Sequence, residues 1–138
     1  MNVYVDTSVL LRVVFGERGA LRQWQSIDVA VSSELIRVEA LRTIDRARVA
    51  ASLSEVDVSE RRAAVLEILG GFHLARIEPS VLERAADPFP TSLRTLDAIH
   101  LATALLARQQ HTDLIFATHD AELARAARAV GLHTIGSP

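Results

Sequence analysis

Neither cysteine nor lysine occurs among the 138 residues of this sequence. Without cysteine, the protein can form no disulfide and no thiolate metal site, so any metal ligands must be oxygen or imidazole groups. Without lysine, it cannot contain a Walker P-loop or a lysine Schiff base, and it lacks the active-site lysine of phosphoaspartate receiver domains. All 15 basic residues are arginine, which binds phosphate as a planar fork, although a GC-rich genome explains the same bias equally well.

Long apolar runs and aromatic residues are also scarce. No stretch reaches the roughly 18 apolar residues of a membrane span, and Asp6 interrupts the N-terminal apolar run too early for a secretory signal. Aromatic residues make up 4% of the chain, which disfavours a base-stacking channel, and a net charge of −2 is no nucleic-acid signature by itself. Together with 49% hydrophobic residues, these features predict one cytoplasmic domain, residues 1–138, that is large enough to bury a core.

Strand-like and helix-like patterns alternate along the chain. The predicted strands are 3–5, 28–32, 73–77, 114–117 and 132–135, and the predicted helices are about 9–14, 20–26, 33–51, 59–71, 79–87, 96–110 and 120–130. Such alternation implies right-handed crossovers and parallel pairing. The expected fold class is therefore α/β: a three-layer α/β/α sandwich with a central, mainly parallel sheet of about five strands. We expect Thr7 or Ser8 to cap the first helix.

Three aspartates stand near one edge of this predicted sheet. Asp6 ends the first strand and Asp120 follows the strand 114–117, so both lie at the carboxyl edge, where ligands bind in open α/β sheets. Asp97 opens the most apolar helix. Asp97 and Asp120 are individually explained as acids at a helix N-terminus, which the helix dipole favours. Asp6 is harder to dismiss, because buried charges are rare unless they are paired or bind a metal.

Glu39 is the fourth candidate, in the middle of a long helix. It shares an arc of the helix with Arg42 and Arg46, away from the apolar side. A solvated ion pair with one of these arginines is the commoner role of such a residue. Glu34 lies close by, but its position in the first helical turn is explained by the helix dipole, so we favour Glu39.

Taken together, the four acids indicate a divalent cation. Carboxylates that converge within a few ångströms repel one another and raise each other's pKa. A divalent cation removes this conflict. Because the chain offers oxygen ligands and no thiolate, Mg²⁺ or Mn²⁺ is favoured over zinc.

Four segments carry these acids and occur in the order of a known family: Val5-Asp6-Thr7-Ser8-Val9-Leu10, Glu39-Ala40-Leu41, Leu96-Asp97-Ala98-Ile99-His100-Leu101-Ala102-Thr103-Ala104 and Thr118-His119-Asp120. With them the chain resembles PIN-domain ribonucleases, specifically the VapC-type toxins of bacterial toxin–antitoxin (VapBC) pairs. The resemblance covers nearly the whole chain. It implies that the catalytic and metal-binding residues are Asp6, Glu39, Asp97 and Asp120, supported by Ser8 and Thr118. It also implies Mg²⁺- or Mn²⁺-dependent cleavage of RNA, neutralisation by a VapB-type antitoxin, and a homodimer.

Arginines near the same edge are candidates for phosphate contacts, although a solvated surface position is the usual role of arginine. The candidates are Arg12, Arg42, Arg46 and Arg94. His100, one turn after Asp97, could hydrogen-bond into the site, but a satisfied, semi-buried histidine is the commoner case.

Three alternatives remain open at this stage. The chain could be a catalytically inactive PIN-like interaction module, or a metal-dependent nuclease that cleaves DNA. An aspartate-nucleophile phosphatase is disfavoured, because that chemistry usually needs a second acid two residues after the nucleophile, where this chain has Ser8, and a lysine.

Overall fold

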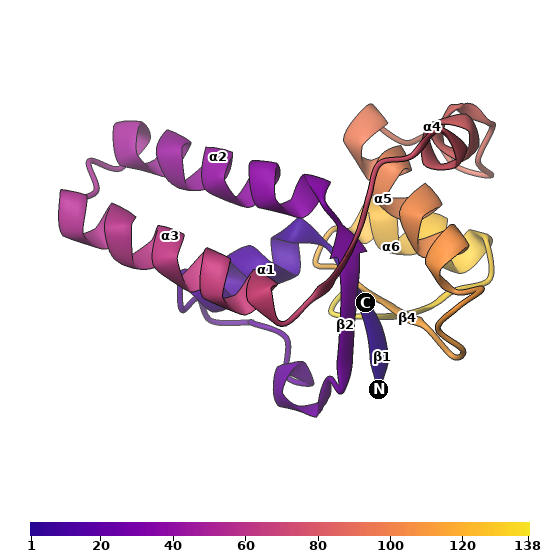
Figure 1. Ribbon diagram of the computed structural model, residues 1–138, viewed down its shortest axis with the longest axis horizontal. Coiled ribbons are helices and arrows are strands. Elements are labelled where there is room, and N and C mark those ends of the chain that lie inside the picture. The colour runs from indigo at the N-terminus through magenta and orange to yellow at the C-terminus, as the bar shows by residue number, and fades with distance from the viewer.

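Five short parallel strands form the central sheet of the computed structural model, which describes residues 1–138 (Figure 1). The strands are β1 (Asn2–Val5), β2 (Val29–Ser33), β3 (His73–Ala75), β4 (Ile115–Ala117) and β5 (His133–Ile135). Their order in the sheet is β3-β2-β1-β4-β5, and every neighbouring pair is parallel. The predicted fold class is confirmed.

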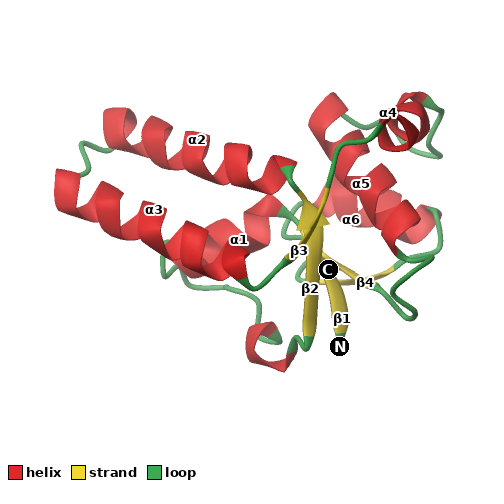
Figure 2. Cartoon of the chain, viewed as in Figure 1, coloured by secondary structure: helices red, strands yellow, loops and turns green.

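Helices cover both faces of this sheet (Figure 2). They are α1 (Thr7–Val14), α2 (Leu35–Ala50), α3 (Glu55–Gly70), α4 (Pro79–Ala86), α5 (Thr95–Ala107) and α6 (Ala121–Ala129), with a short 3-10 helix, η1, at Trp24–Ser26. Residues of α1, α2 and α3 pack in one hydrophobic cluster, and residues of α5 and α6 pack in another. None of the helices combines the length and the apolar character needed to cross a lipid bilayer.

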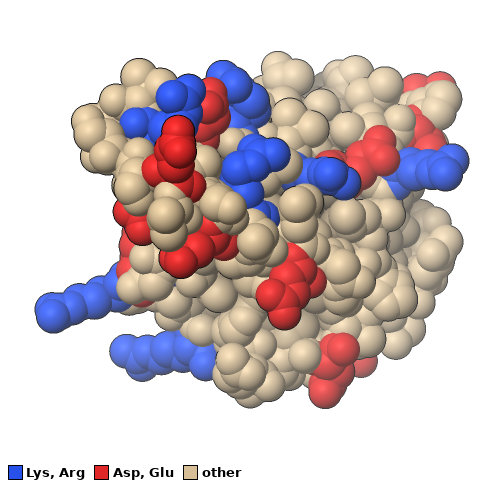
Figure 3. All heavy atoms as spheres, turned by 60° about the vertical axis from the view of Figure 1, so that its left-hand side comes forward, with Lys and Arg blue, Asp and Glu red and all other residues tan.

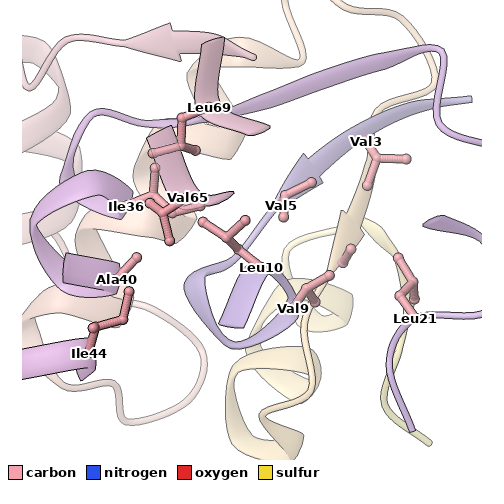
Figure 4. Packing of buried hydrophobic residues seen from close by; sticks show 11 residues of the cluster. Val3, Val5, Val9, Leu10, Leu21, Ile36, Ala40, Ile44, Val65 and Leu69 are labelled. Atoms are coloured by element: carbon pink, nitrogen blue, oxygen red, sulfur yellow. The ribbon is translucent and has the colours of Figure 1, made fainter. Parts of the chain in front are cut away.

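The alternation of side chains along β1 divides the core into these two clusters. Val3 and Val5 are fully buried against α1, α2 and α3 (Figure 4). Tyr4 points to the opposite face, where it stacks on Phe116 of β4 with ring centroids 5.2 Å apart. A strand that is buried on both faces is typically a near-continuous hydrophobic run. This explains the β-forming residues Val3, Tyr4 and Val5 before Asp6.

The order of the strands reverses beside β1. The chain passes from β1 to β2 and β3 on one side of the sheet, and later adds β4 and β5 on the other side. In open parallel sheets, ligands bind outside the carboxyl ends of the strands at such a switch point. The helices α1 and α6 begin directly after β1 and β4, so this edge collects the segments that carry Asp6 and Asp120.

Three local predictions differ from the structure. Asp6, not Thr7 or Ser8, is the N-cap of α1, because its backbone is extended and its carboxylate accepts from the N–H of Ser8. The segment 20–26 forms only the 3-10 turn of η1, since it is too short to gain the cooperativity of a helix. Helix α3 begins at Glu55 and not near residue 59, because the Ser54 hydroxyl caps it by accepting from the N–H of Asp57.

Candidate active site

A cleft of about 460 Å³ opens at the carboxyl edge of the sheet, and all four predicted carboxylates line it. It is bounded by the start of α1, by α2, by the start of α5 and by the end of the loop before α6. The four acids are Asp6, Glu39, Asp97 and Asp120; the other lining residues are Thr7, Ser8, Leu11, Leu35, Val38, Arg42, Thr43, Arg46 and Leu96. Residues from four distant parts of the sequence therefore meet on one surface.

Asp6 is held in place through one of its two carboxylate oxygens. Its Oδ2 accepts hydrogen bonds from the hydroxyl of Ser8 at 2.6 Å and from the hydroxyl of Thr118 at 2.9 Å, with a longer contact of 3.4 Å from the Ser8 N–H. Its Oδ1 has no hydrogen bond within the protein. The residue is buried, with 6% of its surface exposed. One oxygen is thus fixed, and the other remains available as a ligand.

The same two hydroxyls also bind the segment that carries Asp120. Ser8 Oγ accepts from the N–H of His119 at 3.0 Å, and Thr118 Oγ1 accepts from the N–H of Asp120 at 3.0 Å. Each hydroxyl therefore uses its proton on Asp6 and a lone pair on the loop before α6. Ser8 and Thr118 lie where the resemblance places supporting residues.

Asp120 is the N-cap of α6, and its Oδ1 accepts from the N–H of Leu123 at 3.0 Å. The ordinary explanation of this residue, an acid at a helix N-terminus, is therefore correct. It is also incomplete, because Asp120 lines the cleft and its Oδ2 has no hydrogen bond within the protein. The two roles use different oxygens.

Asp97 lies close enough to Asp6 and Asp120 for their charges to affect its pKa. Burial raises the pKa of its carboxyl above the ordinary value, and the negative charges of Asp6 and Asp120 raise it further. Arg94 opposes this effect only weakly, since its Nε lies 3.7 Å from Asp97 Oδ2 and its side chain is 83% exposed. This is the perturbation expected of converging carboxylates that are not neutralised.

Glu39 is bound by two donors on the same oxygen. Its Oε1 accepts from the hydroxyl of Thr7 at 2.8 Å and contacts His100 Nε2 at 2.5 Å. Burial of the carboxyl works against ionisation, but these hydrogen bonds and the charge of His100 hold the pKa of Glu39 below its usual value. Residue Glu34, the alternative acid, is exposed, and its carboxylate accepts from the N–H of Ile77 outside the cleft.

His100 and Thr7 are the residues of the site that the sequence alone did not identify. From the sequence, Thr7 is a candidate cap, and the commoner role of a histidine in the position of His100 is that of a satisfied, semi-buried side chain. His100 is indeed buried and satisfied, but one of its partners is Glu39. The only signal in the sequence was its position one turn after Asp97 on the same helix.

The donor set fits a hard divalent cation. Asp6, Glu39 and Asp120 each have one oxygen without a hydrogen bond within the protein, and the four acids offer oxygen ligands only. No three acidic or histidine side chains lie close enough together here to enclose an ion by themselves. Mg²⁺ commonly keeps several waters and binds through one or two carboxylates together with substrate phosphates. The residues present are therefore suited to Mg²⁺ or Mn²⁺ and poorly suited to a dedicated zinc cage.

The structure divides the four candidate arginines. Arg42 and Arg46 line the cleft, on the same side of α2 as Glu39. Arg94 lies next to Asp97 at the rim. Arg12 turns away from the cleft, because its Nη1 donates to the carbonyl of Gly19 at 3.3 Å, so the structure does not bring it to the site. On the side of the molecule that carries α2 and α3, arginine and acidic side chains are intermingled (Figure 3).

A larger cavity, of about 550 Å³, lies beside the edge strand β3, between α4 and α5. Glu78 is the only acid among its lining residues, and none of the four predicted carboxylates reaches it. Size therefore does not identify the active site. The smaller cleft is the better candidate because the acids gather there.

Comparisons with known proteins match nearly the whole chain. The PIN-domain family model matches residues 3–129. Ribonuclease VapC46 of Mycobacterium tuberculosis strain H37Rv is 33% identical over 137 residues, which cover 96% of this chain and 95% of the relative. Ribonuclease VapC47 of Mycobacterium tuberculosis strain CDC 1551 is 32% identical over 139 residues, which cover 96% and 94%.

Proposed function

This chain belongs to the PIN-domain family, as a VapC-type member, and from that premise we propose that it is a metal-dependent endoribonuclease. The two relatives carry the name ribonuclease and match nearly the full length of the chain. We further propose that the protein is the toxin of a type II toxin–antitoxin pair, that it acts in the cytoplasm, and that it inhibits growth by cleaving RNA.

One observation carries the proposal of a nuclease. Asp6, Glu39, Asp97 and Asp120 come from four separate segments and line a single cleft, and the pKa of Asp97 is raised by burial and by the charges of two of the others. A protein whose surface served only for packing or partner binding would gain nothing from this unneutralised charge. A divalent cation and a phosphodiester would remove the conflict.

In this mechanism, Asp6 and Asp97 would be the primary ligands of Mg²⁺ or Mn²⁺, and Glu39 and Asp120 would hold the cation through water or orient the attacking water. When bound, the ion polarises the scissile phosphate, lowers the pKa of a bound water and stabilises the leaving oxygen. The protein contributes fixed carboxylates: Ser8 and Thr118 immobilise Asp6, and the start of α6 immobilises Asp120.

Arginines on α2 would hold the substrate. Arg46 lines the cleft and its Nη2 donates to Thr43 Oγ1 at 2.9 Å, which leaves the rest of its guanidinium free for a phosphate. Arg42 is less available, because its Nη1 forms an ion pair with Asp45 at 3.1 Å. A guanidinium binds a phosphate with two parallel hydrogen bonds, so one free arginine beside the acids suffices to position the backbone of a nucleic acid.

The test of this function is cleavage of a single-stranded RNA oligonucleotide by the purified full chain. We expect cleavage with Mg²⁺ or Mn²⁺, none with EDTA, and recovery when excess metal is added. DNA of the same base sequence, assayed in parallel, tests the alternative of a DNA nuclease. Cleavage that persists in EDTA, or that occurs on DNA alone, would contradict the proposal. Sequencing of RNA 5′ ends after induced expression would then identify the natural substrate.

A VapB-type antitoxin and a homodimer complete the proposal, and membership of the VapC-type family supports both. Growth should stop when the chain is expressed alone and continue when the antitoxin is expressed with it. Sedimentation of the purified protein should give twice the mass of one chain. The alternative of an inactive interaction module predicts growth arrest, if any, without RNA cleavage and without binding of Mg²⁺.

A further inference from the structure

We propose that His100 is a positioning residue for Glu39, and that Tyr4 holds the imidazole of His100 in the orientation that this role requires. The inference rests on the proposed function, because the position of Glu39 matters only if the four carboxylates act together on a cation. The inference adds a buried series of hydrogen bonds behind the cleft. Its members Tyr4 and His100 are not among the four acidic residues of the site.

Four elements contribute to this series of hydrogen bonds. The hydroxyl of Tyr4, on β1, accepts from the N–H of Ser33, on β2, at 3.1 Å. The same hydroxyl lies 2.7 Å from Nδ1 of His100, on α5. On the far side of the ring, His100 Nε2 lies 2.5 Å from Glu39 Oε1, on α2. This series of hydrogen bonds therefore links the centre of the sheet to the wall of the cleft.

The available protons determine which atom donates in each contact. Burial raises the pKa of Tyr4, so its phenol keeps its proton. Since the N–H of Ser33 already donates to the phenol oxygen, the phenol proton is free to point at His100 Nδ1. The proton of a neutral imidazole is then on Nε2, where it donates to Glu39. If the imidazole is charged, both nitrogens carry protons, and Nε2–H donates to Glu39 in the same way.

The opposite arrangement conflicts with the surroundings of Glu39. A neutral imidazole protonated on Nδ1 would direct a bare lone pair at Glu39 Oε1, which requires a proton on the carboxyl. The hydroxyl of Thr7 already donates to that oxygen at 2.8 Å. Thr7 Oγ1 and His100 Nε2 therefore converge on one oxygen. This geometry suits an ionised carboxylate that accepts both hydrogen bonds, with Nε2–H as the donor.

The consequence for the active site is a fixed carboxylate. Thr7 and His100 both bind Oε1 of Glu39, so its carboxylate cannot rotate freely, and Oε2 has no hydrogen bond within the protein. His100 is 1% exposed, whereas the side chain of Glu39 is 22% exposed and reaches the cleft. An apolar residue of similar size would fill the space of the imidazole, but it would leave the Tyr4 hydroxyl and Glu39 without this partner.

The proton arrangement can be observed without any metal or RNA. In metal-free wild-type protein, a long-range ¹H–¹⁵N correlation spectrum of the histidine rings should show a proton on Nε2 of His100 throughout the pH range in which the protein is folded. The Tyr4→Phe variant should keep the proton on Nε2, because Glu39 still accepts from it, but the Nδ1 resonance should shift, because Nδ1 loses its donor. A wild-type ring protonated only on Nδ1 would overturn the inference.

Two substitutions of His100 distinguish the roles of its two ring nitrogens. In His100→Gln, the side-chain amide can take the place of Nε2 and still donate to Glu39; in His100→Asn, the shorter amide reaches only the place of Nδ1. Loss of such an outer partner typically weakens metal binding or activity by about 10–100-fold. For His100→Asn we therefore expect a loss of about 10–100-fold in Mg²⁺ affinity, measured by calorimetry, and in the rate of RNA cleavage. For His100→Gln we expect both quantities to recover substantially.

A matched control is His133→Gln, because His133 is an exposed residue of β5 and should behave as wild type. Equal values for His100→Asn and His100→Gln, whether both are normal or both are reduced, would overturn the inference. If instead the wild type itself neither binds Mg²⁺ nor cleaves RNA, the proposed function fails, and the ring spectrum of the metal-free protein still decides how His100 is protonated.

Discussion

The hydroxyl of Thr118, at the end of β4, donates a 2.9 Å hydrogen bond to the carboxylate of Asp6, at the end of β1. The same hydroxyl accepts from the N–H of Asp120 at 3.0 Å. Thr118 has no exposed surface, so water cannot replace it. One buried side chain thus sets the distance between two of the four carboxylate-bearing segments. A site made from distant parts of the sequence depends on such links.

Thr118→Val should destabilise the protein, because it removes a donor from Asp6 and an acceptor from Asp120 while it preserves the shape of the side chain. Leaving buried polar groups without partners costs about 1–3 kcal/mol. Urea denaturation measures this change in the free energy of unfolding. Thr118→Ser is the matched control: it keeps the hydroxyl and should remain closer to wild type. A Val variant as stable as wild type would contradict the role of the hydroxyl.

Asp97→Asn should stabilise the metal-free protein slightly at pH 7. Burial and the charges of Asp6 and Asp120 raise the pKa of Asp97, so its ionised form is disfavoured in the folded state relative to the unfolded state. Because the group is only half-buried, we expect a gain on the order of 0.5 kcal/mol. The same variant should lose the rise in melting temperature that Mg²⁺ gives the wild type. A destabilised metal-free variant would argue against repulsion among these acids.

The pair of His100 and Glu39 should make the stability of the metal-free protein depend on pH. Burial favours neutral His100, but the hydrogen bond to Glu39 and the charge of Asp6 outweigh it and raise the pKa of His100 above 6.5. This contribution to stability is complete below pH 6.5 and is lost as the pH rises through the raised pKa. The pKa of Glu39 is lowered from 4.5, so its contribution is complete above pH 4.5 and is lost as the pH falls through the lowered pKa.

Both contributions are therefore present together between pH 4.5 and 6.5. In that window, the free energy of unfolding of wild type should exceed that of His100→Gln by its largest amount. Urea denaturation of both proteins from about pH 4 to pH 9 measures the difference. A difference that stays constant over this range would show that the charges on the pair do not contribute.

Arg46→Gln should weaken RNA binding and reduce its dependence on salt. For single-stranded nucleic acid, each neutralised phosphate contributes about 0.7 to the slope of log affinity against log salt concentration, so the loss of one contact should lower the slope by about that amount. Fluorescence anisotropy with a catalytically inactive background measures it. Arg12→Gln is the control, because Arg12 is bonded to the carbonyl of Gly19 and lies outside the cleft. Equal slopes for both variants would show that Arg46 makes no phosphate contact with the RNA.

Sequence periodicity was sufficient for the fold because the strands and the longer helices have distinct local patterns; the segment 20–26, predicted as a helix, forms only a 3-10 turn. The β-forming run before Asp6 and the apolar helix after Asp97 each have a composition that only a buried element explains. Helix boundaries were less predictable, since they depend on which side chain folds back onto the backbone. Asp6 and Ser54 cap helices by bonds that the sequence permits but does not require.

The four carboxylates could be predicted as a group, with Ser8 and Thr118 as supporting residues, whereas the contacts of Tyr4, Thr7 and His100 behind them could not. Tyr4 and His100 are 96 residues apart, and their hydrogen bond exists only because the sheet and α5 pack together. Likewise, nothing local to Arg12 indicates that its side chain turns to Gly19 and away from the cleft. Hydrogen-bond partners distant in sequence are set by tertiary packing, which a single sequence does not display.

The most direct test of a nuclease site built on the four carboxylates is the rate of Mg²⁺-dependent RNA cleavage by Asp6→Asn. This substitution preserves the size of the side chain and removes the charge that the cleft is built around. Asp113→Asn is the matched control: Asp113 is an exposed residue of positive φ before the amino end of β4, at the edge of the sheet opposite the cleft, and asparagine tolerates that conformation. We expect no detectable cleavage by Asp6→Asn, with an unchanged circular dichroism spectrum, and wild-type cleavage by Asp113→Asn. Wild-type cleavage by a folded Asp6→Asn variant would contradict this assignment of the site.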